Sequence, residues 1–240
     1  MDIISSFVIV AVAALLHASF QLSVSMLTLL SSHAIGKKRS HNRLINLTNS
    51  FVLGAGVMTT LLLSFIALIV IPFGARDEAN MLWVISCGIL ISVGIIVWLF
   101  YYRRQAGTSL WIPRSMARLL SERAKKTKQP VEAFSLGLTS VLAELLFIAA
   151  PLLVSALVLI GLNPYFQLAG VLLYGLVSTS SLLFVNTLIT NGFSLSRIQK
   201  WRESNKNFLQ FAAGSGLLVL GFYVYVDHVV AASVYAAGGL

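Results

Sequence analysis

The sequence predicts an all-α membrane protein with six transmembrane helices arranged as two inverted three-helix repeats. Three observations predict this fold class. The 240 residues are 58% hydrophobic and only 10% charged, the apolar residues fall in six long blocks, and the cations gather between those blocks. Soluble domains carry about 25% charged residues, so the composition excludes an ordinary water-soluble fold. The single cysteine, Cys87, also excludes a disulfide framework and a multi-cysteine metal site.

Each apolar block is long enough to cross a bilayer, because a hydrocarbon core of about 30 Å needs about 20 apolar residues in a helix. The predicted spans cover residues 3–30, 51–71, 81–102, 133–160, 165–189 and 208–230. The first block exceeds the required length, so we expect this span to tilt. Turn residues such as Pro72, Pro164 and Gly192 separate the blocks.

Positive charges set the predicted orientation. All but one of the 17 Lys and Arg residues lie between spans one and two, three and four, or five and six, and only Arg76 lies elsewhere. The positive-inside rule makes that face cytoplasmic and leaves both termini outside the cytoplasm. We therefore expect an integral protein of a bacterial cytoplasmic membrane, whose basic loops attract anionic lipid headgroups rather than nucleic acid. The sequence leaves a homodimer open.

The predicted organisation is a first repeat at 1–102, a cytoplasmic basic loop at 103–131 and a second repeat at 132–240. Within the loop, Met116, Leu119 and Leu120 fall on one helical face and Arg118 lies away from it. This pattern predicts a short amphipathic helix on the inner membrane surface. A solvated basic linker is the alternative.

The repeat is visible as weak internal similarity. An offset of 127 residues aligns spans one and four, with His17 on Glu144, and places Gly94 of span three on Gly221 of span six. An offset of 119 residues aligns spans two and five. Because each half has three spans, the second half must insert upside down relative to the first, which is a common transporter plan. Chance similarity between apolar segments is the alternative.

His17 and Glu144 are the two ionisable residues that lie deep within predicted spans. Such a group costs about 2.5–3.5 kcal/mol at the centre of a membrane helix, so it needs a partner or a function. An imidazole and a carboxylate can ligate a divalent metal, with Gln21 or water completing the shell. Alternatively the pair can take up and release a proton. A His–Glu hydrogen bond that only ties the two halves together is the structural alternative.

Further polar residues accompany this pair. Gln21 and Ser25 share the helical face of His17, and Ser140 shares that of Glu144. Pro151 lacks a backbone donor, so we expect span four to break there. The weaker candidates in spans two and five, which could instead hydrogen-bond within or between helices, are Thr59, Thr60, Thr179 and Asn186.

Six spans, an outward N-terminus and an inverted repeat resemble the LysE-type superfamily of small six-helix exporters. Paired glycines in spans three and six add to the resemblance: Gly88 and Gly94, Gly216 and Gly221. That superfamily includes exporters of amino acids and of cadmium, manganese and nickel, as well as membrane domains of thiol–disulfide carriers. The resemblance implies that spans one and four carry the central site, which falls on His17 and Glu144. The chain lacks the paired membrane cysteines of the thiol carriers, the His/Asp-rich motif of the nickel branch and the Pro-Gly-Pro opening of the amino-acid branch.

We therefore expect a secondary transporter rather than an enzyme. It would export a cation, such as a divalent metal, or a small solute, such as an amino acid, by alternating access with proton coupling. No cofactor is expected beyond a transported divalent metal ion or proton. The alternative is a non-transporting membrane scaffold or partner subunit.

Overall fold

The fold is entirely helical in the part of the chain that the computed structural model describes, residues 2–20, 22–35, 41–74, 79–100, 114–192 and 195–231. No strand occurs in these ranges. The elements are α1 (Ile3–Ser19), α2 (Leu22–Ile35), α3 (His41–Gly74), α4 (Ala79–Phe100), α5 (Arg114–Lys126), α6 (Pro130–Ile160), α7 (Pro164–Ser178), α8 (Ser180–Thr190), α9 (Leu195–Ser204), α10 (Lys206–Val224) and the π-helix η1 (Tyr225–Val230). The predicted all-α class is confirmed.

Four helical segments are each long and apolar enough to cross a bilayer: α3, α4, α6, and α10 together with η1. Two bent pairs, α1 with α2 and α7 with α8, pass the same test together, and each pair bends by 45° at a short break. The chain therefore has four to six candidate spans. The number is six when each bent pair is counted as one span. These six segments overlap the six apolar blocks of the sequence.

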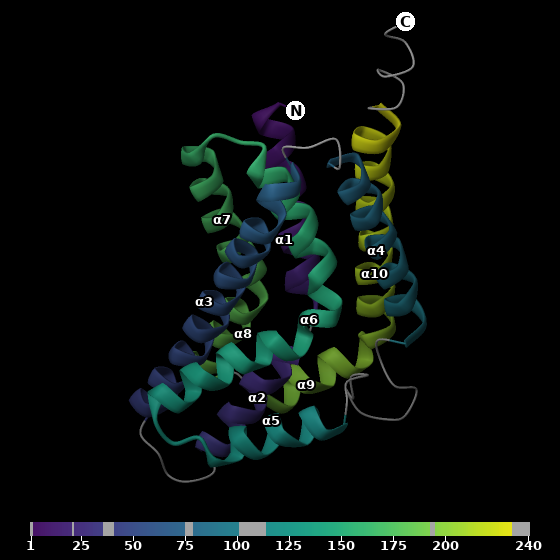
Figure 1. Cartoon of the computed structure of the whole chain (residues 1–240). Coiled ribbons are helices and arrows are strands. Elements are labelled where there is room, and N and C mark those ends of the chain that lie inside the picture. The colour runs from purple at the N-terminus through teal and green to yellow at the C-terminus, as the bar shows by residue number, and fades with distance from the viewer. Residues whose placement is uncertain are drawn as a thin grey trace, which may run out of the picture.

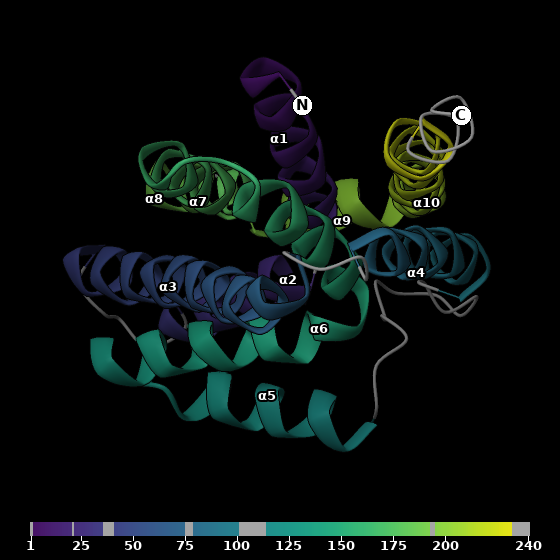
Figure 2. The same ribbon diagram turned by 45° about the horizontal axis from the view of Figure 1, so that its top comes forward.

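Helix α6 is the centre of the bundle. In its most apolar stretch 72% of the residues are buried, against 28% in α3 and 33% in α4. It packs against α3, α1 and α4, and α4 and α10 pair beside it (Figures 1 and 2). The outer helices expose large apolar side chains, as expected where lipid replaces water as the solvent. These include Leu53, Phe65, Leu68, Leu99 and Phe222.

Two glycines bring α3 and α6 into backbone contact. A Cβ on Gly54 would collide with the carbonyl oxygen of Phe134, and a Cβ on Gly137 would collide with that of Phe51. Small residues permit this close approach in membranes, where van der Waals packing rather than hydrophobic exclusion holds helices together. The contact fixes the position of α6 along α3.

Local sequence explains where several helices begin and end. Helix α6 starts at a capping box in which Glu132 accepts a hydrogen bond from the Gln129 backbone N–H at 3.1 Å. Helix α7 starts where Asn163 accepts from the Phe166 N–H at 3.2 Å and Pro164 occupies the first position. Gly192, after α8, has a φ of +81°, a left-handed conformation that favours glycine. The turns predicted at Pro164 and Gly192 are thereby confirmed, whereas Pro72, also expected in a turn, lies inside α3.

Helices α2, α5 and α9 lie at one end of the bundle, opposite the start of α1 and the end of η1 (Figure 1). The helix expected in the basic loop is present as α5, with Arg118 exposed. Its apolar face is only partly free for a membrane surface, because Leu120 and Ala124 are buried where α5 packs against α2 and α6. Leu119 remains 52% exposed. α5 is thus a part of the bundle as well as a surface helix.

Candidate functional site

His17 occupies the last turn of α1, where its side chain is buried. Its Nδ1 atom lies 3.1 Å from the hydroxyl oxygen of Tyr174 in α7, a hydrogen bond between residues 157 positions apart in the sequence. Tyr174 is completely buried, and a buried tyrosine hydroxyl requires such a partner. The bond orients the imidazole and ties α1 to α7.

A small cavity lies next to this imidazole. Its volume is about 10 Å³, which accommodates roughly one water molecule. Helices α1, α3, α6, α7 and α8 contribute to its wall. The lining residues are His17, Phe20, Ala55, Thr59, Val141, Glu144, Ser178, Thr179, Ser181 and Leu182. The structure therefore brings His17 and Glu144, which are far apart in the sequence, to the wall of one cavity.

Both helix breaks border this cavity. Phe20 follows the end of α1, Thr179 separates α7 from α8, and both residues line the cavity. A helix that ends leaves backbone carbonyl groups of its last turn without their usual partners. At the second break the Gly175 carbonyl keeps its usual helical partner, the Thr179 N–H at 3.3 Å, and also accepts from the Thr179 hydroxyl at 2.7 Å. The cavity thus lies where two candidate spans change direction.

Thr59 contributes a buried hydroxyl without a partner among the described residues. Its side chain is 1% exposed and lines the cavity. Leaving a buried hydroxyl unsatisfied costs about 1–3 kcal/mol, so such a group needs a specific explanation. A water molecule or a bound ion in the cavity would supply the missing partner.

Stacked aromatic rings lie beside the cavity. The rings of Phe20 and Phe147 have centroids 5.7 Å apart and planes inclined by 28°. Phe20 and Phe147 are also the residues that the 127-residue offset aligns. Phe20 itself lines the cavity together with His17 and Glu144.

Other predicted residues have structural contacts away from the cavity. Ser140 donates to the Gly137 carbonyl at 2.8 Å and Thr60 to the Val57 carbonyl at 2.9 Å, so both hydroxyls are bonded within their own helices. Ser25 accepts a hydrogen bond from Arg202 at 2.8 Å. Asn186 donates to the Asn49 side chain at 2.7 Å. Gln21 lies outside the described residues.

The expected helix break at Pro151 is wrong. Pro151 lies inside α6, which continues as one helix to Ile160. Its neighbours Ala150 and Leu152 are completely buried. The helix continues although the proline lacks a backbone donor, because burial of this turn favours its packed helical form. The breaks occur instead next to Phe20 and at Thr179.

Sequence reasoning missed Tyr174. Its position in the middle of an apolar span indicates that its hydroxyl needs a hydrogen-bond partner, but not which residue that partner is. His17 was already a candidate on the neighbouring span, and the pairing of the two becomes visible only when α1 and α7 are packed together.

The described residues contain no group of three or more His, Cys, Asp or Glu side chains that could hold a metal ion. A cation at the cavity would therefore be bound by one imidazole and one carboxylate, with neutral oxygens such as the Thr59 and Ser178 hydroxyls completing its shell.

Comparisons with models of protein families, with curated proteins and with solved structures find no match to this chain.

Proposed function

We propose that the chain is a secondary transporter that exports a small cation across the membrane by alternating access around His17 and Glu144. The observation that carries this proposal is their shared cavity. One residue comes from each half of the chain, and both reach the same buried pocket at the point where two candidate spans bend. Ionisable groups in such a position mark ion or substrate pathways in membrane proteins.

The chemistry of the cavity favours a cation over an amino acid. When the Nδ1–H of His17 donates to the Tyr174 oxygen, Nε2 keeps the lone pair that binds a metal ion. The Glu144 carboxylate supplies the compensating negative charge. A volume of about 10 Å³ accommodates a water molecule or a dehydrated ion, whereas an amino acid needs a larger opening. A proton carried between the imidazole and the carboxylate would provide the coupling.

The two bent spans support a transport site. Discontinuous helices near the bilayer midplane are a recurring feature of transporters, since the ends of half-helices offer backbone groups and dipoles to an ion. Here the breaks beside Phe20 and at Thr179 both border the cavity. This arrangement also supplies two points at which the spans could bend during alternating access.

Reciprocal contacts between α4 and α10 support the inverted repeat. A Cβ on Gly94 would lie 3.0 Å from Leu218, and a Cβ on Gly221 would lie 3.0 Å from Ile91. The 127-residue offset aligns Gly94 with Gly221 and Ile91 with Leu218, so the two contacts join equivalent positions of the two repeats. A second pair of contacts corresponds in the same way. The two offsets align α1 with α6 and α3 with α7, and the structure has both an α1–α7 contact and an α6–α3 contact.

We infer the orientation from the charges. The basic helices α5 and α9 lie at one end of the bundle, and the start of α1 and the end of η1 lie at the other (Figure 1). The positive-inside rule assigns the basic end to the cytoplasm of a bacterial cell, in its cytoplasmic membrane.

The test is flux into vesicles reconstituted with purified protein, across a panel of divalent cations and amino acids. The wild type should concentrate at least one divalent cation, and His17→Ala or Glu144→Gln should lower that flux by about 100-fold, as loss of a metal ligand or its support does. His228→Ala and Glu122→Gln are matched controls outside the cavity and should retain flux. No flux of any panel member, with the site variants only less stable, would favour the scaffold alternative.

A further inference from the structure

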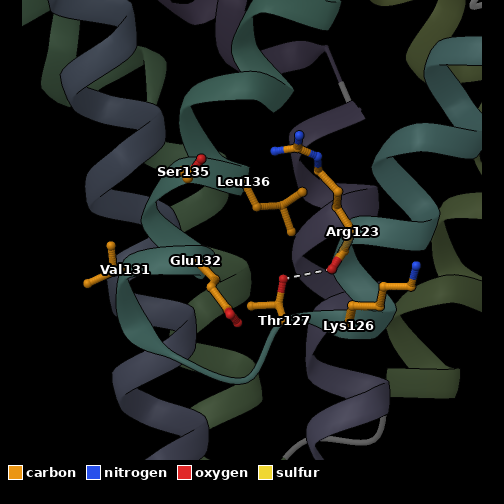
Figure 3. Close-up of a pocket in the computed structure, with 7 residues that line it drawn as sticks. All are labelled: Arg123, Lys126, Thr127, Val131, Glu132, Ser135 and Leu136. Atoms are coloured by element: carbon orange, nitrogen blue, oxygen red, sulfur yellow. Dashed lines mark hydrogen bonds between the residues drawn. The ribbon is translucent and has the colours of Figure 1, made fainter.

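A second, larger pocket lies at the basic end of the molecule, between the end of α5 and the start of α6 (Figure 3). Its volume is about 340 Å³, within the usual range for small-ligand sites. Arg123, Lys126 and Thr127 lie on the α5 side, and Val131, Glu132 and Ser135 lie on the α6 side. It is separate from the cavity at His17 and Glu144, with which it shares no lining residue.

The backbone turn beneath this pocket is held by several hydrogen bonds. Glu132 accepts from the backbone N–H groups of Lys128 at 2.6 Å and of Gln129 at 3.1 Å. The Arg43 guanidinium donates to the Lys128 carbonyl at 2.9 Å, and the Thr127 hydroxyl donates to the Arg123 carbonyl at 2.8 Å. Both bonds to Glu132 go to its Oε2 atom, so they hold the turn while the carboxylate keeps its negative charge at the pocket wall.

Two cations, Arg123 and Lys126, line this pocket together with the Glu132 carboxylate. Arg123 and Lys126 are exposed, and among the described residues no carboxylate lies within ion-pair distance of either. The nearby Glu122 is paired with Arg118 at 2.9 Å. An arginine guanidinium, a lysine ammonium and a serine hydroxyl thus lie on the wall of one pocket, and each of these groups can donate to phosphate oxygens.

The pocket also has an apolar side. Val131 is 76% exposed, and it lies in the first turn of α6, at the beginning of a candidate membrane span. A free phosphate ion has no apolar part, so contact with the Val131 side chain adds nothing to its binding free energy. A lipid carries its phosphate and its acyl chains on adjoining parts of one molecule, so it can use both sides of the pocket.

We propose that this pocket binds the phosphate group of an anionic phospholipid, with Arg123 and Lys126 as its cationic ligands. The Ser135 hydroxyl donates a further hydrogen bond, and an acyl chain lies against the exposed Val131 side chain. The site is specific, unlike the diffuse attraction that all the basic loops exert on a charged membrane surface.

The test is native mass spectrometry of the full chain in detergent, titrated with phosphatidylglycerol or with phosphatidylcholine of the same chain length. Arg123→Gln/Lys126→Gln should weaken phosphatidylglycerol binding by about thirtyfold, since each cation near a charged lipid contributes about a fivefold factor. Arg197→Gln/Lys200→Gln removes the same charges from α9 and should leave binding within about twofold. Equal losses in the two double variants would overturn the proposal in favour of diffuse attraction.

A second variant distinguishes the effect of the pocket's shape from the effect of its two cations. Ser135→Phe fills the pocket and keeps both cations, so it should abolish the preference for phosphatidylglycerol over phosphatidylcholine, and retained preference would contradict a pocket. Inorganic phosphate at millimolar concentration should not displace the lipid. Displacement would identify free phosphate as the ligand and overturn the lipid assignment.

Discussion

The imidazole Nδ1 of His17 and the hydroxyl oxygen of Tyr174 lie 3.1 Å apart in the buried centre of the bundle, joining α1 to α7. This hydrogen bond occupies Nδ1 of His17. When Nδ1–H is the donor, Nε2 keeps the lone pair that can bind an ion or a proton.

The first prediction concerns this bond. Tyr174→Phe keeps the ring and removes the hydroxyl, which leaves Nδ1 of His17 buried without its partner. We expect a loss of about 1–3 kcal/mol in the free energy of unfolding and a lower flux, because the imidazole is no longer oriented. Thermal unfolding in detergent and vesicle flux measure the two effects. Tyr223→Phe, at an exposed position of α10, is the matched control and should change neither.

The second prediction concerns the unpartnered hydroxyl of Thr59. Thr59→Val loses no hydrogen bond to the protein, so stability should be unchanged or slightly higher, while cation flux should fall about tenfold. Thr48→Val on the same helix removes a buried hydroxyl that bonds to the Leu44 carbonyl at 3.1 Å, and should cost about 0.5–1.5 kcal/mol. If Thr59→Val destabilises the protein as much as Thr48→Val and leaves flux intact, the Thr59 hydroxyl has a structural role instead.

The third prediction tests the contact between α3 and α6. Gly54→Ala places a methyl group against the Phe134 backbone, which cannot move without shifting a helix. We expect a loss of at least about 1–3 kcal/mol, the usual cost of overpacking. Gly88→Ala is the control, since nothing lies within 4 Å of its Cβ position and alanine favours the helix by about 1 kcal/mol. Similar unfolding temperatures for the two variants would contradict the backbone contact.

The fourth prediction concerns pH at α5. The hydrogen bond and charge of Arg118 lower the pKa of the exposed Glu122 carboxyl below its ordinary value of 4.5. Because the folded-state pKa is depressed, this pair contributes stability above pH 4.5, and the contribution is lost as the pH falls through the lowered pKa. NMR titration of Glu122 should show the low midpoint, and Arg118→Gln should return it toward 4.5. An unchanged midpoint in that variant would contradict the pairing.

Hydropathy predicted the positions of the long helices well, because apolar blocks of spanning length can cross a bilayer only as helices and the polar segments between them cannot. The helix breaks were not predictable in the same way. Pro151 is the standard signal for a break, yet packing keeps α6 continuous around it. The break at Thr179 carries no proline or glycine, and hydroxyl groups that bond back to the Gly175 carbonyl accompany it.

The candidate site was predictable in part. His17 and Glu144 stood out because ionisable groups are costly in lipid, and the structure places both at one cavity. Thr59 and Thr179 also line it, whereas Thr60 and Ser140 bond within their own helices. Tyr174 could not be assigned from its own segment, since its partner lies on another helix and only packing brings them together.

The most direct test of the account is a double-mutant cycle on cation flux with His17→Ala, Glu144→Gln and the combined variant. If the two residues form one site, each single change should lower flux by about 100-fold and the combined change should lower it little further, because groups that act as a unit are not additive. Effects that multiply in the combined variant, or flux that survives either single change, would contradict a shared site for His17 and Glu144.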